Sequence, residues 1–341
     1  MTDRQALDAA RLEPWLAANV PGYAGPLDIA RFQGGQSNPT FRLTTPAATY
    51  VLRRKPAGEV LPSAHAVDRE FRVLRALHGT DVPVARPLAL CTDPGVIGSM
   101  FYVMDYVDGR IFWDQSLPGL APAERGALYD AMNATIAALH RLDWQALGLA
   151  DYGRPGNYLA RQVARWTKQY RASETEPIEA MDRLIDWLPA HLPAREVPAL
   201  VHGDFRMDNL IFHPTEPRVV AVLDWELSTL GDALADFGYH AMSWRIPPNG
   251  FRGIGGLDLA ALGIPNEADY VAAWCRRTGQ SFPVPDWEVY LVFGMFRIAA
   301  ILQGVLKRGL VGSASSAQAI EHGSRGRAVA AQAWEMARTL G

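Results

Sequence analysis

The sequence predicts an α+β protein in which a small strand-rich part is followed by a larger helical part. Short β-rich runs joined by Gly or Pro fill the first ~110 residues, and apolar residues at helical spacing dominate the rest. One short β-like island, Leu200–Asp224, interrupts the helices. This order fits an α+β architecture better than a repeated strand–helix–strand unit. We therefore expect two domains, residues 1–107 and 108–341.

The strand-rich part is predicted to contain antiparallel strands around one helix. The helix is expected at Ser63–His78, because Val67, Phe71 and Leu74 recur at helical spacing and form one apolar stripe. Short β-rich runs bounded by turn residues predict the strands. The predicted strands are Leu27–Phe32, Thr40–Thr44, Thr49–Arg54, Val82–Leu90 and Ser99–Tyr106.

The second part is predicted to be mainly helical. Its first helix begins at Pro122, since proline is favoured at the first helical position. The predicted helices are Pro122–Arg141, Tyr158–Tyr170, Ile178–Leu188, Glu267–Arg277, Asp286–Leu306 and Ala317–Thr339.

Charge and cysteine content exclude several classes of protein. The 33 basic and 36 acidic residues give a formal charge of −3, so no bulk attraction to nucleic acid or an anionic membrane is expected. The two cysteines, Cys91 and Cys275, form no disulfide framework or zinc motif. Charged residues interrupt the N-terminus, and the apolar stretch Tyr290–Leu302 contains Arg297 and is shorter than a membrane span. We expect a soluble, cytoplasmic protein; the oligomeric state is not predicted.

The island contains the most informative residues of the chain. It reads LVHGDFRMDNLIF from Leu200 and continues as VVAVLDWE from Val219. Asn209 precedes the first predicted strand of a hairpin, and Asp224 follows the second. In an antiparallel pair these two positions lie side by side. Asp204 lies five residues before Asn209, on the loop that enters the hairpin.

These residue types suit phosphoryl transfer. Asn209 and Asp224 supply oxygen ligands of the kind that Mg²⁺ uses together with substrate phosphates. Asp204 is a further carboxylate that can accept a proton from an attacking hydroxyl. A lone HGD or DWE tripeptide could be an ordinary turn. Buried polar groups are costly unless paired or functional, however, and five of them cluster here. They are His202, Asp204, Asn209, Asp224 and Glu226.

His202-Gly203-Asp204 with Asn209 and Asp224 resembles the catalytic loop and metal-binding aspartate of the aminoglycoside phosphotransferase and choline kinase-like family. The resemblance covers roughly residues 31–240 and implies a protein-kinase-like, two-lobed fold, with a small antiparallel-sheet N-lobe and a larger helical C-lobe. It implies that Asp204 is the catalytic base and that Asn209 and Asp224 bind Mg²⁺. It also gives Asp236 a structural role, as an acceptor of backbone hydrogen bonds near the catalytic loop.

The same resemblance implies that the first part binds ATP. Gly34, Gly35, Ser37 and Asn38 lie between two predicted strands, where glycines let backbone amides approach phosphate oxygens. An ordinary hairpin turn is the alternative for this segment.

A cation that binds the phosphates is expected on the strand Thr49–Arg54. The matching position is Arg53, where the family has a lysine, and Lys55 lies two residues further on the same face. Glu70, beside the apolar stripe of the helix, is the predicted acidic partner of this cation. The segment Phe101–Gly109 resembles the hinge that joins the two lobes in this family. The resemblance implies that the Asp105 carbonyl and the Val107 amide bind the adenine ring.

The acceptor is expected to be a small molecule with a hydroxyl group. Segments such as FQGGQSNPTF and VHGDFRMDNLIFHP are similar to the branch of this family found fused to or beside acyl-CoA dehydrogenases. This similarity implies a hydroxyacyl-CoA acceptor. The alternatives are an aminoglycoside or other amino-alcohol kinase, a pseudokinase that binds nucleotide without turnover, and a metal-dependent hydrolase that uses His202 and His213.

Overall fold

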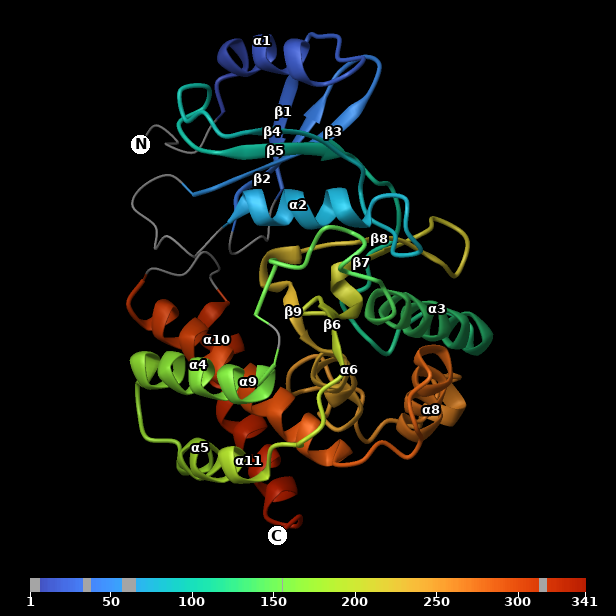
Figure 1. The fold of residues 1–341 in the computed structure, drawn as a ribbon, viewed down its shortest axis with the longest axis vertical. Helices are drawn as coiled ribbons and strands as arrows, with labels where there is room; N and C mark the ends of the chain where they lie inside the picture. The colour runs from blue at the N-terminus through green and yellow to red at the C-terminus, as the bar shows by residue number, and fades with distance from the viewer. Residues whose placement is uncertain (1–6, 33–37, 57–65, 155, 313–317) are drawn as a thin grey trace. The chain divides into compact units, whose positions relative to one another are not determined.

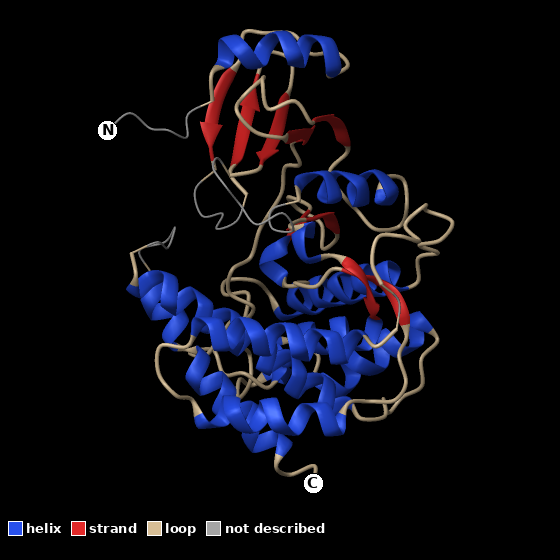
Figure 2. Cartoon of the chain, turned by 60° about the vertical axis from the view of Figure 1, so that its left-hand side comes forward, coloured by secondary structure: helices blue, strands red, loops and turns tan. Residues whose placement is uncertain are grey.

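The computed structural model describes residues 7–32, 38–56, 66–154, 156–312 and 318–341. The chain forms two compact units. Unit 1 comprises residues 1–109 together with Val220–Glu226, and unit 2 comprises Arg110–Val219 with Leu227–Gly341. Figure 2 shows that most strands belong to the first unit and most helices to the second.

Unit 1 contains a five-stranded antiparallel sheet with the order β1-β2-β3-β5-β4. Its two helices, α1 (Ala9–Asn19) and α2 (Val67–Leu77), lie on opposite faces of this sheet (Figure 1). The strands are β1 (Asp28–Arg31), β2 (Thr40–Thr44), β3 (Thr49–Arg54), β4 (Pro87–Cys91) and β5 (Phe101–Asp105).

Successive side chains of a strand point to opposite faces of the sheet, so each side chain packs toward either α1 or α2. Phe101 and Val103 of β5 pack with Leu12 and Leu16 of α1 in one apolar core. Tyr102 points to the other face, where its ring contacts Phe71 of α2. Residues paired with Tyr102 across the sheet therefore face α2 as well.

Unit 2 is built from helices and short strands. β6 (Pro198–Val201) pairs antiparallel with β9 (Thr229–Asp232). A second two-stranded sheet consists of β7 (Leu210–Phe212) and β8 (Val219–Val222), the strands of the predicted hairpin, and residues 220–222 of β8 are counted with unit 1. The helices are α3 (Pro122–His140), α4 (Tyr158–Ser173), α5 (Glu179–His191), α6 (Ala233–Ala241), α7 (Leu259–Leu262), α8 (Glu267–Thr278), α9 (Trp287–Leu310), α10 (Ala319–Ser324) and α11 (Gly326–Ala337), with 3-10 turns at Met207–Asn209, Trp225–Leu227 and Met242–Trp244.

Helix α9 is the central helix of unit 2 and packs against α4, α6, α10 and α11. It has 24 residues and, among the described helices, is the one whose length and composition would allow a membrane crossing. In its most apolar 18-residue stretch, 78% is buried inside the protein, as in the core helix of a globular unit. Its crossing with α6 is close: a Cβ on Gly238 would lie 2.8 Å from Tyr290 Cβ, and one on Gly294 would lie 3.1 Å from Tyr239 Cα.

Several sequence predictions of secondary structure were incomplete. One helix was expected in the strand-rich part, but the described residues of unit 1 form two, and α1 (Ala9–Asn19) was not predicted. The strand expected at Val82–Leu90 begins only at Pro87, because the prolines of this segment lack the amide that a strand ladder needs. The helix expected at Ala317–Thr339 is divided at Arg325 into α10 and α11, where the sequence HGSRG carries two poor helix formers. The segment that forms β9 and α6 was not assigned to regular structure.

Candidate active site

In unit 1, Arg53 is directed toward α2 by the register of the sheet. Arg53 pairs with Tyr102 across β3 and β5, so both side chains project from the same face. The Arg53 Nε lies 2.8 Å from Glu70 Oε2, which confirms the predicted ion pair. Glu70 is only 2% exposed and also accepts hydrogen bonds from Asn38 Nδ2 at 2.7 Å and the Tyr102 hydroxyl at 3.0 Å.

Two more carboxylates surround the Arg53 guanidinium. Its Nη2 lies 2.7 Å from Asp224 Oδ1 and 3.6 Å from Glu226 Oε2, and all of these residues belong to unit 1. Asp224 adopts a left-handed conformation with φ 63°, two residues after the end of β8. We call Arg53, Glu70, Asp224 and Glu226 the Arg53 cluster. Glu226 was noted in the sequence as a polar residue, but its contact with Arg53 was not predicted.

The Arg53 cluster has more negative than positive groups. Burial lowers the pKa of Arg53, but Glu70 and Asp224 more than offset it, so the guanidinium stays charged. Burial raises the pKa of Glu70, and Arg53 opposes that shift. With three carboxylates and one guanidinium, the cluster has a formal excess of two negative charges.

This charge excess suits a divalent cation. Asp224 is 34% exposed, and its Oδ1 binds Arg53, so its Oδ2 is the carboxylate oxygen best placed for a further ligand. No group of three His, Cys, Asp or Glu side chains able to bind a metal by themselves occurs in the described part of the chain. Mg²⁺ fits such a donor set, because it takes one or two carboxylates and completes its shell with phosphates and water.

In unit 2, the loop after β6 has a backbone that is fixed by hydrogen bonds. Gly203 has φ 81°, and a Cβ there would lie 2.7 Å from the Leu227 carbonyl oxygen, so glycine is required. The carboxylate of Asp236 accepts the amides of His202 and Gly203, each at 2.8 Å. The predicted structural role of Asp236 is therefore confirmed. His140 Nε2 lies 3.2 Å from the same carboxylate.

The Asp204 carboxylate is bound on both oxygens. The Tyr239 hydroxyl donates to Oδ1 at 2.9 Å, while Arg206 Nη2 at 2.8 Å and Asn209 Nδ2 at 3.1 Å bind Oδ2. We call Asp204, Arg206, Asn209 and Tyr239 the Asp204 network. Burial raises the pKa of Asp204, but the Arg206 charge and the Tyr239 hydrogen bond help to outweigh it, so the pKa lies below its usual value. Asp204 is therefore ionised at neutral pH.

The amide of Asn209 is oriented by Asp204. Asn209 closes a 3-10 turn, and its Nδ2 donates to the Asp204 carbonyl at 2.8 Å as well as to the carboxylate. Both bonds use the amide nitrogen, which leaves the amide oxygen Oδ1 as the group that can ligate a metal. This orientation agrees with the predicted role of Asn209.

A second set of charged and aromatic side chains adjoins the Asp204 network. Asp208 Oδ2 forms ion pairs with Arg206 at 3.7 Å and with Arg252. Both guanidinium groups lie over the Phe251 ring, at 5.6 Å and 5.5 Å, and Arg252 also lies 5.5 Å from the ring centre of Trp113. Trp113 is 65% exposed. Cationic and aromatic side chains therefore extend from the predicted catalytic carboxylate to the surface of unit 2.

Comparison with known proteins decides the family. The model of the phosphotransferase enzyme family APH matches residues 28–288, which is more than half of the chain. The chain belongs to the APH phosphotransferase family. The predicted family resemblance and the protein-kinase-like, two-lobed α+β fold are confirmed. The family is one of small-molecule kinases.

The relatives of this APH-family chain include both named proteins and solved structures. Mouse acyl-CoA dehydrogenase family member 10 is 49% identical over 319 residues, which are 93% of this chain and 30% of that protein. The chain spans 30% of the length of that protein and 44% of the length of chicken acyl-CoA dehydrogenase family member 11, which it also matches. A Ralstonia eutropha JMP134 structure with the provisional name aminoglycoside phosphotransferase is 58% identical, with TM-score 0.89 over 98% of this chain and 99% of that chain. Spectinomycin phosphotransferase, solved with ADP and spectinomycin, shares the fold at 12% identity, with TM-score 0.63 over 97% and 99% of the two chains.

The structure describes only some of the residues that are predicted to bind the nucleotide. Gly34, Gly35 and Ser37 lie outside the described residues, so the predicted phosphate loop stays a prediction. Asn38 is described, and its side-chain amide donates a hydrogen bond to Glu70 of α2. The Asp105 amide donates to the Arg86 carbonyl at 3.0 Å, and its carboxylate pairs with Arg86.

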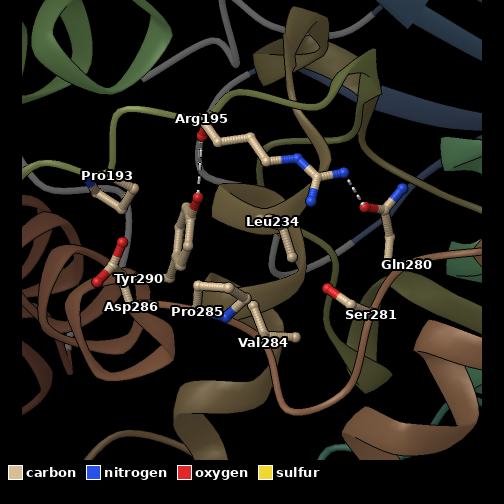
Figure 3. A pocket seen from close by; sticks show the side chains of 9 residues that line it. All are labelled: Pro193, Arg195, Leu234, Gln280, Ser281, Val284, Pro285, Asp286 and Tyr290. Atoms are coloured by element: carbon tan, nitrogen blue, oxygen red, sulfur yellow. Dashed lines mark hydrogen bonds between the residues drawn. The ribbon is translucent and has the colours of Figure 1, made fainter.

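The sequence did not reveal Tyr239 or Arg206 as partners of Asp204. A small cavity of about 30 Å³ in unit 2 was not predicted either. Figure 3 shows Tyr290 and Arg195 at its wall, where the Tyr290 hydroxyl donates to the Arg195 carbonyl. None of the predicted site residues lines this cavity, which is large enough for water but not for a nucleotide.

Proposed function

We propose that this chain is an ATP- and Mg²⁺-dependent phosphotransferase that transfers the γ-phosphoryl group to a hydroxyl of a small molecule. The observation that carries the proposal is the geometry of Asp204. Its carboxylate is bound on both oxygens, is ionised, and follows a loop whose backbone is fixed by Asp236. A general base requires this combination of fixed position and available charge.

Asp204 orients the acceptor hydroxyl and takes its proton as the oxygen attacks phosphorus. Arg206 and Tyr239 stabilise the ionised carboxylate before the proton arrives. Because the phosphoryl group has a loose transition state, positioning and charge neutralisation contribute more than covalent chemistry. Arg53, fixed by Glu70, supplies positive charge to the nucleotide phosphates in this proposal.

Asn209 and Asp224 are the proposed Mg²⁺ ligands. Bound Mg²⁺ would neutralise charge on the phosphate oxygens. The formal negative excess of the Arg53 cluster and the available Oδ1 of Asn209 support these assignments. Gly34, Gly35, Ser37 and Asn38 are the proposed phosphate loop, and the backbone of Asp105 and Val107 is the proposed adenine contact.

We propose a hydroxyacyl-CoA as the acceptor. Two observations favour an anionic acceptor over a polycationic aminoglycoside. Arg206 of the Asp204 network and the neighbouring Arg252 are guanidinium groups that can bind an anionic acceptor, and their partners in the structure are Asp204 and Asp208. The name of the mouse relative, acyl-CoA dehydrogenase family member 10, points to the same chemistry. The provisional name of the 58% identical structure favours an aminoglycoside or amino-alcohol acceptor, which is the second candidate.

The test is release of ADP from MgATP with a panel of acceptors: hydroxyacyl-CoA thioesters, the free hydroxy acids, an aminoglycoside and an amino alcohol. Each acceptor is assayed with the wild type and with Asp204→Asn, which keeps the shape of the side chain. We expect turnover with a hydroxyacyl-CoA that Asp204→Asn abolishes. Turnover confined to the aminoglycoside would establish the second candidate. A rise in melting temperature with MgATP and no ADP release with any acceptor would indicate a pseudokinase.

A further inference from the structure

Helix α9 places one arginine in the core of unit 2. Arg297 is 3% exposed, and no described Asp or Glu lies within ion-pair distance of it. A buried cation is costly unless nearby groups compensate for its lost hydration. The sequence shows this residue only as an interruption of an apolar run. Its retention in the core calls for a specific set of contacts.

Within the described part of the chain, the guanidinium of Arg297 contacts two aromatic rings and one carbonyl. Its guanidinium lies 4.6 Å from the ring centre of Tyr239 and 5.2 Å from that of Trp166, which is the geometry of cation–π attraction. Its Nη2 donates a hydrogen bond to the Gly203 carbonyl. The buried Nε has no hydrogen-bond partner within the described chain.

Two of these contacts lead directly to Asp204. Gly203 is the residue before Asp204, so a bond to its carbonyl fixes the peptide plane from which the Asp204 side chain projects. Tyr239 donates its hydroxyl to Asp204 Oδ1 at 2.9 Å, so the arginine that packs on its ring also fixes that donor. A single guanidinium therefore constrains Asp204 through its backbone and through its carboxylate.

We propose that Arg297 is a positioning residue for phosphoryl transfer, which fixes Gly203 and Tyr239 so that the Asp204 carboxylate meets the acceptor hydroxyl. This inference rests on the proposed function of Asp204. Arg297 touches neither nucleotide nor acceptor in this account.

The experiment compares Arg297→Met, Arg297→Lys and Tyr239→Phe in the acceptor assay. Loss of a residue that orients a catalytic group typically costs 10–100-fold in activity, so we expect kcat of Arg297→Met to fall by about that factor. The KM for MgATP should change less than about twofold, because the nucleotide keeps its contacts. Arg297→Lys should recover part of kcat, and Tyr239→Phe, which keeps the ring but loses the hydroxyl, should lose about 3–10-fold.

Two controls separate positioning from folding. Lys307→Met removes an exposed cation from the same helix, where it donates to the Ala172 carbonyl, and should leave kcat unchanged. In an Asp204→Asn background, Arg297→Met should lower the residual rate by less than about twofold. The effects of two substitutions that act through the same group do not add. An equal loss in both backgrounds would overturn the proposal.

A crystal structure of Arg297→Met provides a readout that does not require turnover. Positioning predicts that the Tyr239–Asp204 hydrogen bond is broken and that the Asp204 carboxylate has rotated. An unchanged Asp204 in that structure would refute the inference, whatever the acceptor assay gives. An inactive wild type combined with a displaced Asp204 would refute the proposed function and leave the positioning role supported.

Discussion

The Arg53 cluster and the Asp204 network arrange charge in opposite ways. In the Arg53 cluster, three carboxylates surround one guanidinium. In the Asp204 network, one carboxylate is surrounded by a guanidinium, an amide and a hydroxyl that all donate to it. In the proposed function, the Arg53 cluster contributes to binding of metal and phosphate, and the Asp204 network accepts the proton of the acceptor hydroxyl.

The largest expected effect comes from removing the charge at the centre of the Asp204 network. Asp204→Asn should lower kcat by about 10²–10⁴, the usual contribution of a general base. The rise in melting temperature caused by MgATP should persist, because the Arg53 cluster is intact. Calorimetric titration of MgATP and single-turnover kinetics measure the two properties separately. A native rate for this variant would refute the role of Asp204 as base.

Removing the charge at the centre of the Arg53 cluster should act on stability and on nucleotide binding. Arg53→Met leaves Glu70 buried without its cation, which should lower the free energy of unfolding by on the order of 3 kcal/mol. The KM for MgATP should rise, because the phosphates lose a guanidinium. Adding Glu70→Gln should restore part of the stability, measured by urea unfolding, but not the KM. Restoration of both would show that Arg53 acts through stability alone.

Asp232 is a buried carboxylate without a cationic partner among the described residues, and it shows how neighbouring cations change the pKa of Asp204. Asp232 accepts two backbone amides, from Val197 and Leu234, each at 3.1 Å, and burial raises its pKa to about 6, whereas the pKa of Asp204 is lowered. A carboxyl group whose pKa is raised on folding stabilises the fold below its unfolded pKa near 4, and loses that contribution as the pH rises through 6. For Asp204 the sign is opposite: its contribution is lost only as the pH falls below 4.

Urea unfolding of the wild type and Asp232→Asn between pH 4 and 7 measures this effect. The stability of the wild type relative to the variant should fall by about 2–3 kcal/mol across that range, since one pKa unit corresponds to ~1.4 kcal/mol. A constant difference between the two proteins would mean that Asp232 titrates normally.

The smallest effect is expected at the edge of the Asp204 network. Arg252→Gln removes a cation that pairs with Asp208 and stacks on Trp113, without touching Asp204. We expect KM for an anionic acceptor to rise about 3–10-fold with kcat unchanged, the pattern of lost uniform binding. A cationic or neutral acceptor provides the control and should show no such rise. An equal rise for every acceptor would argue against charge recognition.

Local pattern was enough to predict part of the site. Glu70 was identified because it lies beside the apolar stripe of its helix, and Asp236 through the family resemblance. Tyr239 and Arg297 could not be identified as partners of Asp204, since they lie 35 and 94 residues from the atoms they bind and belong to no local motif. A lone arginine in the apolar run of α9 was the available signal. The domain boundary and the cytoplasmic localisation stay predictions.

Chain order also misleads where tertiary contacts are discontinuous. The segment Val220–Glu226 lies in the sequence among the residues of unit 2, yet it is part of the compact unit 1. The amide of Val222 donates to the Pro83 carbonyl, and Asp224 binds Arg53. Hydrophobic periodicity reports which face of an element is buried, but not which distant segment covers it.

The crossing of α6 and α9 gives two residues without functional groups an influence on chemistry. Gly238 and Gly294 lie where the two helices almost touch, next to Tyr239 on one helix and three residues from Arg297 on the other. A methyl group at either glycine would force the helices apart and shift the phenol and the guanidinium together. Heritable change in catalytic rate can therefore arise at positions that never meet a substrate, and a search for such change should include the spacing between helices as well as the reactive side chains.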